Sequence, residues 1–467
     1  MRVAAIDQGT TSTRCIVVEA GGHWHLTGAR VHAQHHRQPG WVEHDPEELL
    51  TNIRWLLREA GPVDAIAIAN QGESCLAWDA LSGEAFSPVI VWQDARTAAA
   101  LQAMNEAAHT RAKEISGLPL DAYFSASKLG WILRHSEAAR AAHAKGCLRL
   151  GTTDAFFLDR LCGVFATDAA TASRTGLLDL RRGVWSEELC ALHGVPASTL
   201  PPILPVDHGF GAIAGVPVKV SIVDQQAALY GHGCREPGDT KITFGTGAFL
   251  LTLSGATPVA SSALLPTIAW QRGGGPSVYA LEGGVYDAGA ALEWARRLGL
   301  YDDVAELGSF EGPSAISRGL VFVSALSGLG APHWDREAAA LFIGMRHDTG
   351  RRDMVRAVLE GIALLTAELI REAAAAAAMP LKRGISIDGG LSQSAYFAQF
   401  LAAAAGVEIR VPAMHELTAI GLAELCGVDC GPIRAAGAVF RPDGSVPQAL
   451  RARFAAALAG ARGWHGA

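Results

Sequence analysis

Residues suited to binding a phosphate group follow the first apolar stretch of the chain. Val3 to Ile6 is expected to form a strand, and it leads directly into residues 7–14, DQGTTSTR. The carboxylate of Asp7 can hold a metal ion, Gly9 lets backbone amides approach a ligand, and hydroxyls and a guanidinium can contact phosphate oxygens. A plain hairpin would have a similar sequence, so this motif needs support from a second one.

Two later turns have the same form. Residues 241–244 (KITF) lead into residues 245–249 (GTGAF), and the apolar residues 385–387 lead into Asp388, Gly389 and Gly390, with a helix expected from Ser394 to Ala405. Each turn alone could serve only to reverse the chain. Three such turns in order favour a duplicated fold that holds nucleotide phosphates from both sides.

Asp224 is the strongest candidate for a catalytic group. It follows the apolar run from residue 218 to residue 223 and precedes Gln225 and Gln226. A carboxylate at a strand end can accept the proton of a hydroxyl group as its oxygen attacks phosphorus. It can equally cap a helix over residues 225–230. The residues alone leave both interpretations open.

The elements that would position these groups alternate between strands and helices, which is typical of mixed α/β domains. Residues 65–69 are expected to form a buried strand that ends at Asn70, Gln71, Gly72 and Glu73, and residues 89–92 form another. Ligand groups collect beyond the carboxyl ends of such strands. The Ala-rich residues 373–378 are expected to form a helix that Pro380 ends.

Composition excludes several classes of protein. The chain has 467 residues, 49% of them hydrophobic and 18% charged, with a net charge of −7. This length suits two domains of about 230 residues each, and we place their boundary between residues 231 and 232. The acidic balance argues against nucleic acid as a partner, and no apolar run approaches the roughly 20 residues of a membrane helix.

The cysteines and histidines indicate a reducing environment and no structural metal. Eight cysteines are scattered without the spacing of a disulfide framework, and the N-terminus lacks the pattern of a signal peptide, so we expect a cytoplasmic protein. The histidines between residues 23 and 36 lack a completing Cys or carboxylate pattern, so they are expected to be packed or solvated.

Ten stretches of the sequence resemble the FGGY carbohydrate kinases, which share the superfold of actin, hexokinase and the heat-shock ATPases, and most closely the glycerol kinases among them. The stretches are DQGTTSTR at Asp7, GWVEHDPEEL at Gly40, VWQDART at Val91, AYFSASK at Ala122, ASRTGLLDL at Ala172, DQQAALYG at Asp224, FGTGAF at Phe244, ALEGGVYDAGA at Ala280, SGLGAPHWD at Ser327 and DGGLSQS at Asp388. They are colinear and run nearly from end to end of the chain.

The resemblance implies an α/β fold of two duplicated, actin-like (RNase H-like) domains, residues 1–231 and 232–467, with an ATP cleft between them. It implies an ATP-dependent kinase that phosphorylates a terminal hydroxyl of a small polyol or sugar, with Asp224 as the base and Asp7 at the Mg²⁺ of MgATP. The implied acceptor-binding residues are Glu73, Trp92, Tyr123, Asp224, Gln225 and Phe249. The implied nucleotide-binding residues are Thr10, Thr11, Ser12, Arg14, Thr246, Gly289, Glu293, Gly390 and Ser394.

The chain departs from the glycerol kinases at four positions, two in these sets and two directly beside them in the sequence. Gly72 replaces the arginine that binds substrate hydroxyls, and Val223 replaces the glycine before the base. Glu293 and Ser394 replace Gln and Asn. Hydrogen bonds to charged groups contribute about 1.5–3 kcal/mol, so the loss of an arginine at Gly72 favours a longer polyol or a ketose whose extra carbons fill the vacated space.

Two other classes of function remain open. An actin-like or chaperone-like ATPase would not need Asp224, Gln225 and the aromatic pocket. A ligand-sensing relative without catalysis is conceivable because of Gly72, although Asp7, Thr246 and Asp224 argue against it. A homodimer is expected on general grounds alone.

Overall fold

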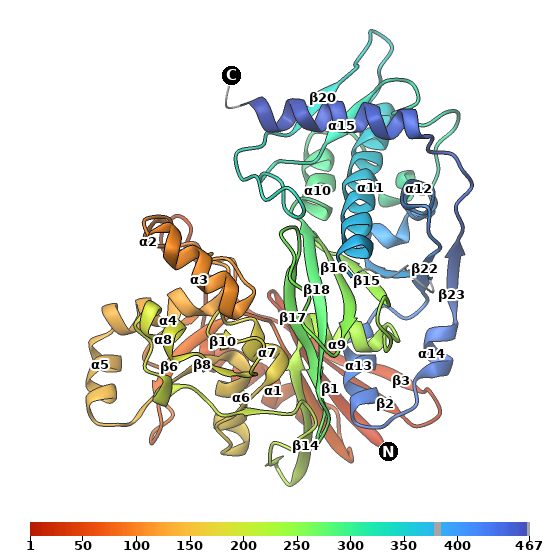
Figure 1. The fold of residues 1–467 in the computed structure, drawn as a ribbon. Helices are drawn as coiled ribbons and strands as arrows, with labels where there is room; N and C mark the ends of the chain where they lie inside the picture. Colours follow the sequence, from red (N-terminus) through yellow and green to blue (C-terminus); the bar gives the residue numbers. More distant parts are fainter. Residues whose placement is uncertain (378–383, 465–467) are drawn as a thin grey trace.

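The computed structural model describes residues 1–377 and 384–464. Two twisted sheets form the centre of the molecule, one from each half of the chain (Figure 1). The first has the order β13-β14-β5-β1-β2-β3. Its strands are β1 (Arg2–Gln8), β2 (Ser12–Glu19), β3 (Trp24–Val31), β5 (Ala65–Asn70), β13 (Ala212–Ile213) and β14 (Val216–Val223).

The second sheet repeats the topology of the first. Its order is β17-β18-β16-β15-β21-β22-β23. The strands are β15 (Thr240–Phe244), β16 (Ala248–Gly255), β17 (Leu265–Gln271), β18 (Ser277–Val285), β21 (Ile385–Gly389), β22 (Ile409–Pro412) and β23 (Gly437–Phe440). In each sheet the first strand, β1 or β15, pairs antiparallel with the next strand and parallel with a later one, β5 or β21. The predicted duplication of an α/β domain is confirmed.

Further elements extend each half. The first half carries the sheet β4-β7-β6-β8 and the α2–α5 lobe, drawn in orange and yellow in Figure 1. Its elements are β4 (Glu43–His44), α1 (Pro46–Glu59), β6 (Cys75–Asp79), β7 (Val89–Ile90), α2 (Ala98–Gln102), α3 (Glu106–Ser116), α4 (Ser125–His135), α5 (Glu137–Ala144), β8 (Leu148–Thr152), α6 (Thr153–Cys162), β9 (Thr167–Asp168), α7 (Ala169–Ser173), β10 (Leu178–Asp179), β11 (Val184–Trp185), α8 (Glu187–His193), β12 (Ile203–Leu204) and α9 (Asp224–Gly231).

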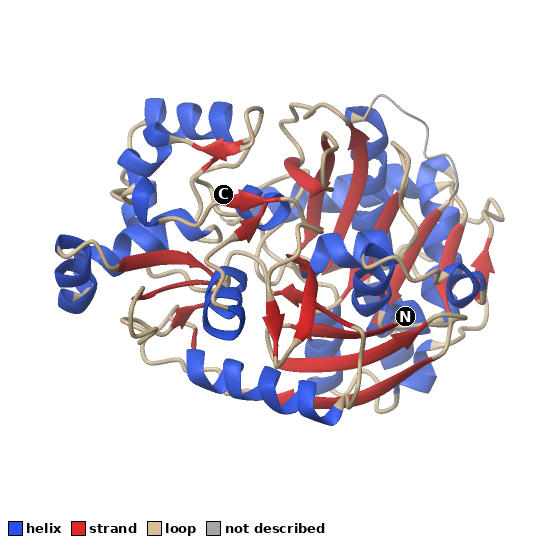
Figure 2. Cartoon of the chain, turned by 90° about the horizontal axis from the view of Figure 1, so that it is seen from below, coloured by secondary structure: helices blue, strands red, loops and turns tan. Residues whose placement is uncertain are grey.

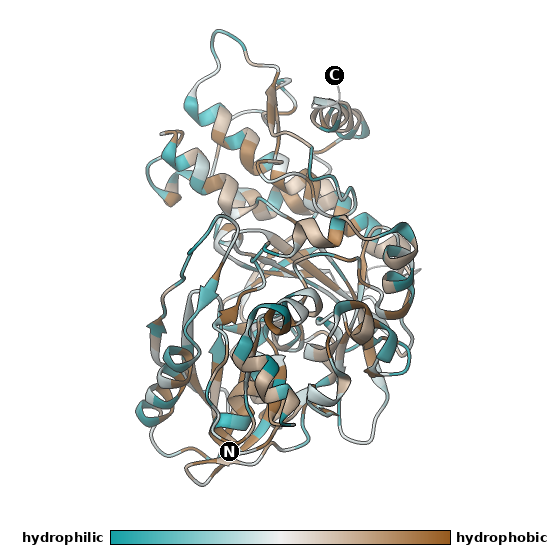
Figure 3. Cartoon of the chain, turned by 90° about the vertical axis from the view of Figure 1, so that its left-hand side faces the viewer, coloured by the Kyte–Doolittle hydropathy of each residue, from teal (hydrophilic) through white to brown (hydrophobic). Residues whose placement is uncertain are grey.

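The second half adds α10 (Gly289–Arg297), β19 (Val321–Val323), β20 (Leu341–Ile343), α11 (Arg351–Ala376), α12 (Ala395–Ala405), α13 (Leu417–Leu425), α14 (Gly431–Ala435) and α15 (Gln448–Gly463). Helices lie outside the strands in the view from below (Figure 2), and many of them present one hydrophobic and one hydrophilic face (Figure 3). Residues 373–376 of the predicted Ala-rich helix form the end of α11, whereas Ala378 and Pro380 lie outside the described residues. No helix in the described part of the chain is both long and apolar enough to cross a membrane.

Helices α9 and α13 join the two halves. One hydrophobic cluster contains residues of both sheets and of both helices. The helices cross so closely that a Cβ atom on Gly231 would lie 1.9 Å from the carbonyl oxygen of Leu417, and one on Gly421 would lie 1.9 Å from that of Ala227. Only glycine fits at these two positions, so the sequence fixes the distance between the halves at this crossing. The division after residue 231 stays a prediction.

Candidate active site

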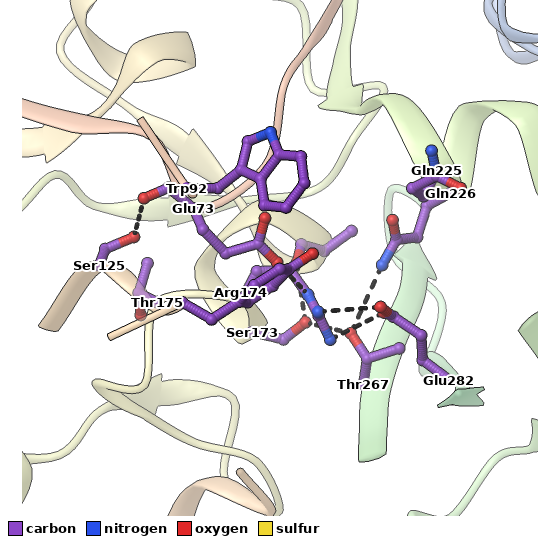
Figure 4. Close-up of polar contacts among 12 residues, drawn as sticks. Glu73, Trp92, Ser125, Ser173, Arg174, Thr175, Gln225, Gln226, Thr267 and Glu282 are labelled. Atoms are coloured by element: carbon purple, nitrogen blue, oxygen red, sulfur yellow. Dashed lines mark hydrogen bonds and ion pairs between the residues drawn. The ribbon is translucent and has the colours of Figure 1, made fainter. Parts of the chain in front are cut away.

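A small cavity brings together all six predicted acceptor-binding residues. Its volume is about 90 Å³, well below the roughly 300–1,000 Å³ of a pocket for a drug-sized ligand. The lining residues are Thr10, Gln71, Gly72, Glu73, Trp92, Tyr123, Arg174, Val223, Asp224, Gln225, Gln226, Phe249 and Glu282. Several of them converge in Figure 4. In the first half they come mainly from the segments that follow strands and helices, among them β5 and β14, and in the second half they belong to β16 and β18, so both halves of the chain form the cavity.

Asp224 lies at the carboxyl end of β14 and is the first residue of α9. Its Oδ1 accepts a hydrogen bond of 2.6 Å from the N–H of Gln225, the next residue. This contact differs from the N-cap geometry that the sequence left open, in which the carboxylate accepts from an amide two or three residues later. Burial raises the pKa of Asp224 to about 8, and the negative charges of Asp7 and Glu73 add to this. Such a group can take up a proton near neutral pH.

A buried ion triad borders the cavity. Arg174 Nε donates to Glu73 Oε1 over 2.7 Å, and Nη2 donates to Glu282 Oε1 over 3.1 Å. Burial raises the pKa of Glu73 to about 6 even though Arg174 opposes this. Glu73 has a φ of 59°, a conformation that non-glycine residues rarely adopt and that is enriched at functional sites. The hydroxyl of Ser125 donates to the Glu73 carbonyl and holds it in place.

The space beside Gly72 is smaller than the sequence suggested. A Cβ atom on residue 72 would lie 3.0 Å from Cγ2 of Val223, closer than ordinary van der Waals contact. The two departures from the glycerol kinases are therefore neighbours in space, and the valine side chain fills part of the volume that a larger residue 72 would need. The expectation of room for a longer acceptor at Gly72 has no support in this geometry.

Aromatic side chains connect the cavity to the first phosphate loop. Trp92 and Tyr123 lie with ring centroids 5.4 Å apart on one wall. The indole N–H of Trp92 donates to Thr10 Oγ1 over 2.9 Å. The acceptor wall and the residue expected to contact phosphate are thus held together by one hydrogen bond.

The first loop is a tight turn in which the Gly9 N–H donates to the Ser12 carbonyl over 3.0 Å. Burial raises the pKa of Asp7 to about 6, with a further contribution from Glu416. Arg14 forms an ion pair of 3.1 Å with Glu416 beside it. Thr11 and Arg14 are exposed and Ser12 is half-buried, so their side chains are accessible to a ligand.

The second and third loops lie side by side. The Gly289 N–H, at the start of α10, donates to the Gly245 carbonyl over 3.0 Å, and a Cβ atom on Gly389 would lie 2.1 Å from the Phe244 carbonyl oxygen. Thr246 and Gly390 are exposed. These contacts bring together the residues expected to bind nucleotide in the second half.

Two predicted nucleotide-binding side chains already have partners. Ser394 caps α12, accepting from the Phe397 N–H and donating to the Leu307 carbonyl over 2.6 Å. Glu293 forms an exposed ion pair of 2.9 Å with Arg296. Their contacts with nucleotide, like the roles of the other predicted site residues, stay predictions.

Sequence reasoning missed three charged residues of the site. Arg174 and Glu282 lie within the stretches ASRTGLLDL and ALEGGVYDAGA, and Lys241 begins the run before FGTGAF. Lys241 is fully buried, and its Nζ donates to Gln225 Oε1 over 2.5 Å and to Thr243 Oγ1 over 2.9 Å. Burial lowers the pKa of Lys241, against the attraction of nearby carboxylates. For Lys241, the signal available in the sequence was a charged residue inside a strand next to a ligand loop.

Comparisons with known proteins agree with this architecture. Sequence models of the N-terminal and C-terminal domains of the FGGY family of carbohydrate kinases match residues 2–231 and 240–430. The chain belongs to this family. It is an ATP-dependent kinase of the glycerol kinase-like type.

Individual relatives support the finer assignment. The chain is 41% identical to a glycerol kinase of Aromatoleum aromaticum, with 91% of this chain and 90% of the relative aligned. It is 40% identical to a glycerol kinase of Thermus brockianus, with 92% and 90% aligned. The structure of Plasmodium falciparum glycerol kinase with ADP superposes with a TM-score of 0.90 at 27% identity, covering 98% of each chain. A xylulose kinase from Lactobacillus acidophilus, with a TM-score of 0.85 at 20% identity over 99% of each chain, shares the fold.

Proposed function

We propose that this chain transfers the γ-phosphoryl group of MgATP to a terminal hydroxyl of glycerol or of another polyol of about that size. The observation that carries the proposal is the small cavity at the end of β14, where Asp224 lies among Glu73, Gln225 and aromatic walls. Carboxylate and amide groups can bind the hydroxyls while aromatic rings contact the carbon chain. The similarity to glycerol kinases supports the same acceptor class.

The proposed chemistry follows from the positions of the side chains. Asp224 accepts the proton of the acceptor's terminal hydroxyl while that oxygen forms a bond to the γ-phosphorus, and the bond from phosphorus to the bridging oxygen of ADP breaks. Positioning and charge neutralisation supply most of the rate in such a reaction. Trp92, tethered to Thr10, keeps the acceptor next to the phosphate loop.

The carboxylates fit a magnesium ion that arrives with the nucleotide. Within residues 1–377 and 384–464, no group of three or more His, Cys, Asp or Glu side chains is arranged to hold a metal. Mg²⁺ is often bound through one or two carboxylates together with substrate phosphates. Asp7, whose pKa is raised by burial, would gain from a cation nearby. When bound, the ion neutralises charge on the transferred phosphoryl group.

An assay of ADP formation with and without glycerol tests this proposal directly. We expect ADP release to depend on both glycerol and Mg²⁺, and Asp224→Ala to abolish it. Equal ADP release without any acceptor would instead indicate an ATPase of the same superfold. A cytoplasmic location and a homodimer stay predictions, and size-exclusion chromatography with light scattering tests the latter.

A further inference from the structure

Arg174 is a buried cation that the proposed chemistry has not yet used. Arg174 is the C-cap of α7 and is 2% exposed, and its side chain lines the acceptor cavity. The guanidinium carbon lies 6.0 Å from the ring centroid of Tyr123, another wall of the same cavity. Figure 4 shows the guanidinium between Glu73 and Glu282, below the ring of Trp92.

The hydrogen bonds of Arg174 are incomplete. An arginine carries five N–H donors, of which Nε donates to Glu73 and Nη2 donates to Glu282. Nη1 lies 2.9 Å from Glu282 Oε2, yet it is buried and forms no hydrogen bond with any described residue. The charge of Nη1 is thus paired with Glu282, whereas its N–H groups have no hydrogen-bond acceptor. A buried N–H group without an acceptor is costly, so a ligand oxygen placed against Nη1 would be bound favourably.

The neighbouring position cannot supply this donor. Gly72 has no side chain, and Val223 crowds the place where one would begin. The arginine that lines the cavity is Arg174. A guanidinium is therefore still present at the acceptor, although it comes from a different element of the chain.

We propose that Arg174 binds the acceptor, donating a hydrogen bond from Nη1 to a hydroxyl that is not phosphorylated, and so selects polyols that carry that hydroxyl. The inference rests on the proposed function. Glu73 and Glu282 orient the guanidinium from the two halves of the chain, and Nη1, which is ion-paired with Glu282 but makes no hydrogen bond, supplies the donor for the ligand. An acceptor without the hydroxyl would leave this buried donor unpaired, which is the basis of the discrimination.

The test compares glycerol with 1,2-propanediol and 1,3-propanediol, each of which lacks one hydroxyl. We expect the wild-type protein to favour glycerol over at least one diol by about 10- to 100-fold in kcat/KM, the effect of a hydrogen bond to a charged group. In Arg174→Gln this preference should fall to within about threefold because less of the charged interaction remains, with the KM for ATP unchanged. Arg174→Lys keeps a cation between the carboxylates but lacks the several N–H donors of the planar guanidinium. It should show the same loss of preference.

A matched control separates binding from stability. Arg356→Gln removes another buried arginine, which pairs with Glu360 over 3.1 Å and does not line the cavity. It should lower the unfolding temperature and leave the preference for glycerol intact. If Arg174→Gln or Arg174→Lys keeps the wild-type preference, Arg174 is structural and the inference is wrong. A wild-type protein that phosphorylates none of the three compounds would instead remove the proposed function.

Discussion

Replacing Asp224 by asparagine should strongly slow phosphoryl transfer and stabilise the ligand-free protein. Asparagine has nearly the same shape, and its Oδ1 can still accept the hydrogen bond from the Gln225 N–H. It cannot accept the proton of the acceptor, so we expect kcat to fall by about 10²- to 10⁴-fold, the usual contribution of a general base. The gain in stability arises because the variant no longer places a third carboxylate near Asp7 and Glu73.

The size of the gain depends on pH. Well below pH 3.8 the aspartate is protonated in both the folded and the unfolded chain, so it makes no difference to stability. As pH rises from 3.8 to about 8, the unfolded chain releases this proton while the folded chain keeps it, so the stability of the wild type falls. At about 1.4 kcal/mol per pKa unit, the upper limit above pH 8 is roughly 6 kcal/mol. We expect about 1–2 kcal/mol to be measured, because Asp224 is only half-buried and solvent screens its charge.

Thermal unfolding of both proteins without nucleotide, at intervals from pH 4 to pH 9, measures this difference. The two curves should lie closest at pH 4 and separate as pH rises, with the variant more stable. A variant that is inactive but equally or less stable at pH 9 would refute the electrostatic reasoning. A variant with full turnover would refute the assignment of the base.

Three further predictions address the rest of the site and the fold. The acceptor kcat/KM should rise with pH and level off above an apparent pKa near 8, because only ionised Asp224 can accept a proton; a profile that is flat from pH 6 to pH 9 would contradict this. Lys241→Met should raise the acceptor KM by about tenfold, because Gln225 loses a charge-assisted hydrogen bond. An unchanged KM in steady-state kinetics would contradict this prediction. Gly421→Ala should lower stability by roughly 3 kcal/mol or more through the clash with the neighbouring helix. The control Gly460→Ala, whose Cβ meets only Leu341 at 3.9 Å, should raise stability slightly, by up to about 1 kcal/mol, because alanine favours a helix interior.

The sequence alone predicted the parts of the site that depend on local patterns. Asp7, Asp224 and Asp388 each end an apolar run, and the structure places each at or near the end of a strand, β1, β14 and β21 respectively. Hydrophobic runs that end at glycine or aspartate are short-range signals, so they can be recognised without knowledge of the tertiary fold. The duplication followed from the repetition of these signals.

Contacts between distant residues could not be predicted in the same way. Val223 crowds Gly72 across 151 positions of sequence, and Arg174 pairs with Glu282 across 108. Each of these residues has an unremarkable local pattern, and its role arises only when two sheets pack together. The prediction of extra space at Gly72 was drawn from one position at a time, which explains why it lacks support in the structure.

The measurement that tests the central claim most directly is a ³¹P NMR analysis of products from MgATP and an equimolar mixture of glycerol, erythritol and xylitol. The small cavity beside Asp224 predicts that the principal product is the phosphate monoester of a terminal hydroxyl of glycerol. A dominant phosphate ester of the five-carbon polyol, or inorganic phosphate with no ester, would contradict the account.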